Sequence, residues 1–207
     1  DIRSTGNANE LRELYQRTCY IQESVGANTN HFAGIIPGCF THLRVNRQKN
    51  ELEATVNNVV KAVFFIRSSQ NHLEESPVII LGSKGYIGRN VTEKLRKAGI
   101  HVIAVDLFDS FLKPIIPYMI INITRPEAVN DYVEAAYMSD KGVLLNEVYP
   151  APHESIVLEM KSLGMKVFHI AGVSATCNPP FPGPYKNALP CCAALPFEDY
   201  KIEVVEL

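Results

Sequence analysis

The sequence predicts an α/β fold in which a mostly parallel, doubly wound sheet follows a helical N-terminal region. From Ser76 onward, short β-branched runs alternate with helical patterns, as expected for a parallel sheet with helices on both faces. The residues before Ser76 show helical spacing and few strand signals. With 207 residues, 46% of them hydrophobic, the chain can bury a core of its own.

Residues 1–74 predict two helices. The first covers Asn7–Val25 and ends at Gly26, and the Asn- and Gly-containing residues 27–38 are expected to be a loop. The second covers Glu51–Arg67 and should pack on the sheet through an apolar stripe. The stripe consists of Leu52, Val56, Val59, Val60, Val63 and Phe64.

Residues 75–207 predict the sheet and its connections. Prolines lie near the starts of the expected helices Pro126–Met138 and His153–Leu163. This position agrees with a helix N-terminus, where a missing N–H costs nothing. The expected strands are Val78–Leu81, His101–Val105, Tyr118–Ile123, Gly142–Leu145, Lys166–Ile170 and Lys201–Val205, and the expected helices are Ile87–Ala98, Pro126–Met138 and His153–Leu163.

Charge and hydropathy exclude two classes of partner. The formal net charge is -2 and the chain has no Lys/Arg run, so nucleic acid is not expected. The longest apolar stretch, Phe111–Ile123, is short and is interrupted by Lys and Pro, so no membrane span is expected. Residues 1–10 are polar and lack the apolar segment of a signal peptide. The sequence leaves open whether a region precedes Asp1.

The five cysteines favour a cytoplasmic protein with reduced thiols. Their number is odd and no CxxC occurs. Cys177, Cys191 and Cys192, together with His169, match no zinc spacing, so no metal site is expected.

The strongest motif is the glycine-rich stretch Gly82–Gly88, which lies between the first strand and its helix. In a phosphate-binding loop, Gly82 would allow the sharp turn, Gly85 the approach of a diphosphate, and Gly88 the close packing of helix on sheet. The N–H groups and dipole of the helix start would then bind the diphosphate. The alternative is a loop whose glycines serve steric needs only.

Asp106 ends the second strand, where the dinucleotide fingerprint places an acid for the adenosine ribose. The combination predicts NAD as the cofactor. Because residues 107–110 contain no Lys or Arg, we expect NAD to be preferred over NADP. The expected cofactor contacts are Gly82, Ser83, Lys84, Gly85, Tyr86, Ile87, Gly88, Asp106, Asn122 and Thr124.

The loop Gly82–Gly88, with its GxxGxxG spacing and aromatic-Ile-Gly ending, resembles that of extended short-chain dehydrogenases and sugar-nucleotide epimerases. The resemblance extends through Val102–Asp106 and implies a Rossmann-like, NAD(P)-binding domain over residues 75–207. That family also uses a Tyr-x-x-x-Lys pair. Tyr137 and Lys141 have this spacing but follow the glycines too closely, so the role is not carried over.

The later half is similar in layout to the cofactor domains of shikimate-type and 2-hydroxyacid-type dehydrogenases. The similarity lies in Tyr118–Thr124, then in Gly142–Pro150 with its Pro-containing turn, and then in a helix and Gly164–Val167. It implies that Asn122 and Thr124 line the cofactor crevice, and it transfers no catalytic residue.

Ligands of open α/β sheets lie beyond the carboxyl ends of the strands. Glu147 and His153 flank one Pro-containing turn there and are the candidate acid-base pair for hydride transfer. The alternative is a solvated acid and a histidine in a helix first turn. His169, inside a strand, is expected to be a satisfied core histidine. The other candidate crevice residues are Thr124, Asn146, Tyr149, Gly172 and Ser174.

These observations predict an NAD-dependent oxidoreductase that acts on a small polar metabolite. The alternative is a non-catalytic NAD-binding sensor or assembly subunit, and a methyltransferase shares the strand-loop-acid layout. Residues 1–74 would buttress the sheet or form part of a substrate domain. Lys186 and Asn187, in a Pro-rich segment, would belong to a lid or would be ordered by a partner subunit in a homodimer.

Overall fold

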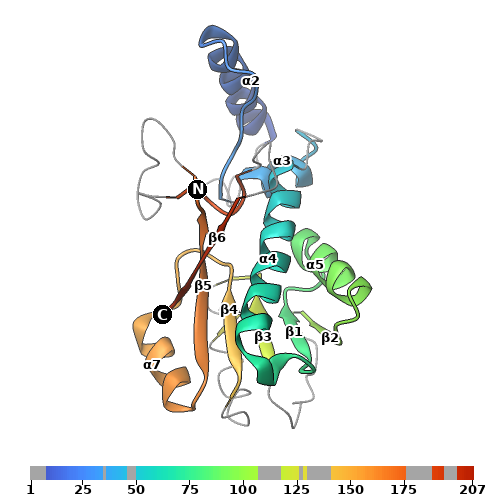
Figure 1. The fold of residues 1–207 in the computed structure, drawn as a ribbon. Coiled ribbons are helices and arrows are strands. Elements are labelled where there is room, and N and C mark those ends of the chain that lie inside the picture. The colour runs from blue at the N-terminus through green and yellow to red at the C-terminus, as the bar shows by residue number, and fades with distance from the viewer. Residues whose placement is uncertain are drawn as a thin grey trace.

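The computed structural model describes residues 8–34, 36–45, 50–106, 118–125, 128–129, 141–175, 188–193 and 200–207. These residues form an α/β fold around a six-stranded sheet with the order β2-β1-β3-β4-β5-β6 (Figure 1). Strands β1 to β5 are parallel and β6 is antiparallel to β5. The mostly parallel sheet is therefore confirmed.

All six expected strands are present, with ends shifted by a few residues. They are β1 (Val78–Leu81), β2 (Val102–Val105), β3 (Met119–Asn122), β4 (Val143–Asn146), β5 (Lys166–Val173) and β6 (Ile202–Glu206). The first three are centred on apolar runs whose β-branched side chains suit a buried sheet. Register aligns Leu81, Asn122, Asn146 and His169 across β1, β3, β4 and β5. The four residues thus form a row across the sheet, at the carboxyl ends of β1, β3 and β4 and in the middle of the longer β5.

The helices also agree with the sequence, with one correction. They are α2 (Ala8–Ser24), α3 (Ile36–His42), α4 (Asn50–Ser69), α5 (Tyr86–Lys97) and α7 (Glu154–Ser162), with a 3-10 turn at Asn71–Leu73. The expected loop over residues 27–38 was too long, because α3 begins at Ile36. Pro37 is tolerated in its first turn, and Phe40 is buried. Most of the expected helix Pro126–Met138 lies outside the described residues.

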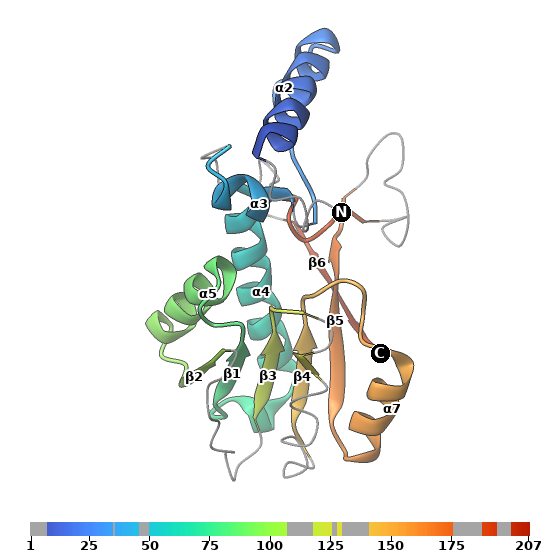
Figure 2. The same ribbon diagram turned by 180° about the vertical axis from the view of Figure 1, so that it is seen from behind.

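Helices cover both faces of the sheet. On one face, α4 and α5 bury their apolar side chains against Val78, Ile80 and the matching positions of β3 and β4. On the opposite face, seen in Figure 2, α7 packs with Ile79, Leu81 and Leu144. The alternating strand residues therefore divide between two apolar layers, as the two-residue period of a strand requires.

Helix α4 packs on the sheet as its apolar stripe predicts, but its buried face is rotated relative to the predicted stripe. Val59, Val63 and Ile66 are fully buried, whereas Phe64 is 45% exposed. Inclusion of Phe64 in the stripe was therefore wrong. Ile66 lies seven residues after Val59, on the same face of a helix with 3.6 residues per turn, and it takes the buried position instead.

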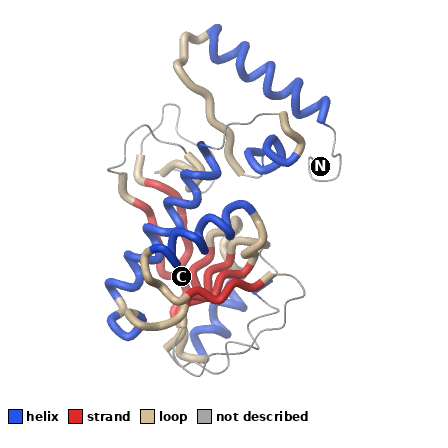
Figure 3. Tube along the Cα trace, turned by 90° about the vertical axis from the view of Figure 1, so that its right-hand side faces the viewer, coloured by secondary structure: helices blue, strands red, loops and turns tan. Residues whose placement is uncertain are grey.

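Helix α2 lies apart from the sheet (Figure 3). An aromatic cluster connects it to α3: the ring of Phe40 lies 5.7 Å from that of Tyr15 and 4.7 Å from that of Phe32. Among the helices that the structure describes, none combines the length and apolar character needed to cross a membrane.

Candidate functional site

The glycine loop turns sharply between β1 and α5. Gly82 has a φ of 90°, which L side chains rarely adopt. A Cβ on Gly88 would overlap the carbonyl oxygen of Gly82, so only glycine allows α5 to start this close to the strand. Gly85 is the N-cap of α5 and is exposed. The first turn of α5 thus begins at the carboxyl edge of the sheet, with Gly85 exposed among the described residues.

Asp106, directly after β2, forms a hydrogen bond with the glycine loop. The backbone N–H of Lys84 donates to Oδ2 of Asp106 over 2.7 Å. The N–H groups of Gly82 and Ser83 both donate to the carbonyl of Val105, over 3.0 and 3.1 Å. The loop is therefore fixed on the end of β2, with the Asp106 carboxylate beside it.

A row of polar side chains crosses the carboxyl edge of the sheet. Asn122 Nδ2 donates to Asn146 Oδ1 over 3.0 Å, and Asn146 Nδ2 lies 3.1 Å from Nδ1 of His169. Thr124 N donates to Asn122 Oδ1 over 3.3 Å. Burial lowers the pKa of His169. His169 is thus a buried histidine with hydrogen-bond partners, as expected.

A cavity of about 480 Å³, which we call the strand-end pocket, lies beyond the ends of β3 and β4. Its apolar walls include residues of α3, α4 and the start of α5, and its polar groups come from the turns after the strands and from Thr55 of α4. The lining residues are Gly34, Pro37, Gly38, Leu52, Thr55, Ile87, Ile123, Thr124, Glu147, Val148, Tyr149, Ile170, Pro190, Cys191 and Cys192. The pocket adjoins the glycine loop, because Ile87 belongs to both.

Glu147 and Cys191 meet in the strand-end pocket. The thiol of Cys191 donates to Oε1 of Glu147 over 3.3 Å. Burial raises the pKa of Glu147 to about 7, and the hydrogen bond from Cys191 acts in the opposite direction. Burial and the nearby carboxylate also raise the pKa of Cys191. A carboxyl with this pKa can both accept and donate a proton near neutral pH, whereas the thiol remains protonated.

Two contacts hold Cys191 in place. Leu189 exchanges backbone hydrogen bonds with Val173 of β5, at 2.8 and 2.9 Å. Gly172 permits this approach, since a Cβ there would overlap the carbonyl oxygen of Leu189. Asn58, a buried residue of α4, donates to the carbonyl of Cys191 over 2.6 Å. The chain after β5 is thus anchored to both the sheet and α4.

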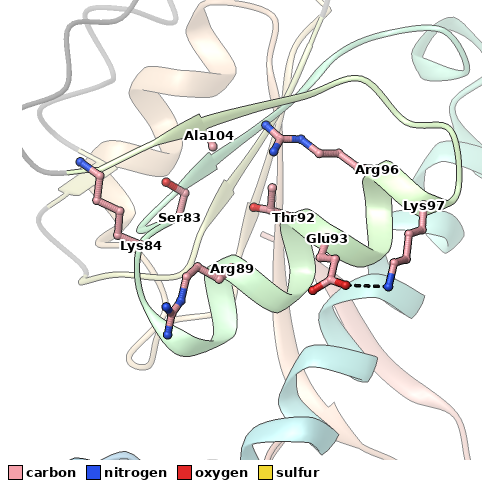
Figure 4. Close-up of a pocket in the computed structure, with 8 residues that line it drawn as sticks. All are labelled: Ser83, Lys84, Arg89, Thr92, Glu93, Arg96, Lys97 and Ala104. Carbon is pink, nitrogen blue, oxygen red and sulfur yellow. Dashed lines mark hydrogen bonds and ion pairs between the residues drawn. The ribbon is translucent and has the colours of Figure 1, made fainter.

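A second cavity, of about 660 Å³, lies along α5 and the edge strand β2 (Figure 4). We call it the basic groove. It is lined by Ser83, Lys84, Arg89, Thr92, Glu93, Arg96, Lys97 and Ala104. Lys97 pairs with Glu93 at 2.6 Å, and Arg96 donates to the carbonyl of Val102 over 3.1 Å. Ser83 and Lys84 connect this groove to the glycine loop.

The structure separates the two candidate acid-base residues. Glu147 lines the strand-end pocket, but His153 is an exposed N-cap of α7 whose Nδ1 accepts from the N–H of Ser155 over 3.2 Å. Thr124 and Tyr149 line the strand-end pocket, whereas Asn122 and Asn146 are buried in the polar row. Ser174 donates to Glu203 of β6.

Sequence reasoning missed Cys191 and Thr55 as pocket residues. Cys191 is 44 residues from Glu147, and no local spacing connects them.

Within the described ranges, no three His, Cys, Asp or Glu side chains form a group that could hold a metal ion. Lys186 and Asn187, which the sequence predicts to belong to a lid, and Tyr137 and Cys177 lie outside those ranges.

Comparisons with protein-family models, with curated proteins and with solved structures found no match to this chain.

Proposed function

We propose that the chain has a Rossmann-like nucleotide-binding fold and binds NAD with its diphosphate over Gly82–Gly88. Ligands of doubly wound sheets bind where successive connections leave in opposite directions. Here β1 lies between β2 and β3, so that point falls between β1 and β3. The glycine loop follows β1, and Gly82 lies against Ile123 and Thr124, which follow β3.

The loop geometry suits a diphosphate. Gly85 is exposed, and a Cβ there would find only the carbonyl oxygen of Gly82, at 3.4 Å. The first helical bond runs from Arg89 N to Gly85 O, so the N–H groups of Tyr86, Ile87 and Gly88 belong to the first turn of α5, where the dipole favours anions. The Asp106 carboxylate, fixed beside Lys84, would accept hydrogen bonds from the ribose hydroxyls.

The observation that carries the proposal is this loop, closed by Asp106 and adjoining a pocket that contains an acid. NAD would supply the hydride acceptor or donor for oxidation or reduction of a small polar metabolite. Glu147 would exchange the accompanying proton, and Ile87 and Thr124, which line the pocket beside the glycine loop, would contact the cofactor where it enters the pocket. His153 remains a prediction, but its place on α7 does not support a role beside Glu147.

The proposal is tested by calorimetric titration of NAD into the wild type and into the variant Gly85→Val. The φ of -65° and ψ of 166° at Gly85 suit a β-branched residue, so the variant should fold. Its side chain would occupy the diphosphate position and should abolish NAD binding. Unchanged affinity would refute the proposal. NAD binding by the wild type without turnover of any small polar substrate would instead favour the non-catalytic sensor.

A further inference from the structure

We propose that the strand-end pocket binds a small organic ammonium ion with Glu147 as its counter-ion, so that the metabolite is an amine. The inference rests on the proposed function for its role in catalysis, but the binding itself does not require NAD.

The charge of the pocket favours a cation. Among its described lining residues, Glu147 is the one acid, and no Lys, Arg or His is present. Glu51 precedes the pocket residue Leu52 in α4 and is a second buried carboxyl near the pocket. Nδ1 of His31 lies 3.5 Å from Oε1 of Glu51. A carboxylate or phosphate substrate would normally be matched by Arg or Lys. Here it would instead meet Glu147.

The hydrogen-bonding groups of the pocket also favour a donor ligand. Thr55 Oγ1 donates to the carbonyl of Glu51 over 3.0 Å, so its lone pairs remain as acceptors. In the part of the chain that the structure describes, the side chain of Glu147 accepts from the thiol of Cys191, and a thiol is a weak donor. An ammonium group brings three strong donors and would replace this weak hydrogen bond by a charge-assisted one.

The apolar walls limit the rest of the ligand. Leu52, Ile87 and Ile170 line the same cavity of about 480 Å³, which suits a short hydrocarbon body. Burial of this surface would add to affinity. A small alkyl or cycloalkyl amine therefore satisfies both the polar and the apolar parts of the pocket.

The same arrangement accounts for the proton in amine oxidation. The ammonium nitrogen would give one proton to the Glu147 carboxylate and become a neutral amine. Its lone pair would form the C=N bond as the hydride leaves the adjacent carbon for NAD⁺. The products are an iminium ion and NADH, and the proton remains on Glu147 until it is released to solvent.

Ligand-observed NMR with two probes tests the inference: butylammonium and butyrate, each added without NAD at about pH 8, where Glu147 is largely ionised. Butylammonium should bind, and butyrate should not. Glu147→Gln should weaken butylammonium at least about tenfold, as expected for loss of a charge-assisted hydrogen bond. The matched control Glu154→Gln, at an exposed acid of α7, should leave binding unchanged.

Equal binding of butyrate and butylammonium, or unchanged binding to Glu147→Gln, would overturn the inference. If that variant fails to fold, the comparison of probes on the wild type still decides. A separate NAD titration distinguishes the two proposals. Ammonium binding without NAD binding would refute the cofactor assignment alone, and NAD binding without ammonium binding would refute the substrate class alone.

Discussion

The backbone N–H of Lys84 donates to Oδ2 of Asp106 over 2.7 Å, and it connects the glycine loop to the end of the neighbouring strand across 22 residues of sequence. Asp106 therefore has a structural role in the loop as well as its proposed role toward the ribose. Substitutions at Asp106 must separate these two roles.

We predict that the wild type prefers NAD over NADP by about a hundredfold, because a 2′-phosphate would face the Asp106 carboxylate. Asp106→Asn keeps an acceptor for the Lys84 N–H but removes the charge, so NADP should bind closer to the level of NAD. Asp106→Ala removes both and should also weaken NAD. Calorimetric titration of both cofactors into the three proteins measures the effect.

Equal affinities in the wild type, or tighter NADP binding, would show that Asp106 does not face the ribose. The basic groove would then be the place for the phosphate, since Lys84 and Arg89 line it. Arg89→Ala should in that case weaken NADP and not NAD. Residues 107–110, on whose lack of cations the expectation also rests, lie outside the described part of the chain.

The second prediction concerns pH and Glu147. Burial raises its pKa from 4.5 to about 7, so between these values the folded protein holds a proton that the unfolded chain has lost. The free energy of unfolding should therefore fall as pH rises through this window. This contribution to the free energy of unfolding is fully present below about pH 4.5 and is lost as pH rises through about 7, and it amounts to at most about 3.4 kcal/mol.

Urea unfolding of the wild type and Glu147→Gln between about pH 5 and pH 7.5 measures this contribution, because Gln does not titrate. The stability difference between the two proteins should change with pH. His169, whose pKa is lowered by burial, acts in the opposite direction but is present in both. A pH-independent difference would contradict the burial of Glu147. Glu154→Gln should show no such change.

The third prediction concerns the polar row. Asn146→Ala removes the acceptor of Asn122 Nδ2 and the donor to the carbonyl of Val148, and it leaves the amide of the fully buried Asn122 without this partner. We expect a loss of about 2–4 kcal/mol in the free energy of unfolding. Asn57→Ala, at an exposed position of α4, should cost about 0.5 kcal/mol or less. Similar losses in both variants would contradict the structural role of the row.

The strands and the loop could be predicted because their signals are local. Val78–Leu81 is a continuous apolar run, and Gly82, Gly85 and Gly88 follow at fixed spacing. Each residue is constrained by its chain neighbours, so sequence alone gave the position of the loop and of Asp106.

The strand-end pocket could not be assembled in this way. The sequence predicts Asn58 only as part of the helix Glu51–Arg67, yet its side chain donates to the carbonyl of Cys191, 133 residues later in the chain. The approach of Leu189 to Gly172 depends on the path of the chain after β5. Such contacts follow from packing between distant segments, and neither periodicity nor spacing contains them.

A structure of the protein in complex with NAD tests the central claim most directly. The account predicts diphosphate oxygens within hydrogen-bond distance of N–H groups in Gly82–Gly88, the adenosine ribose on Asp106, and the nicotinamide C4 facing Glu147 in the strand-end pocket. A dinucleotide bound elsewhere, or one whose nicotinamide lies outside this pocket, would contradict it.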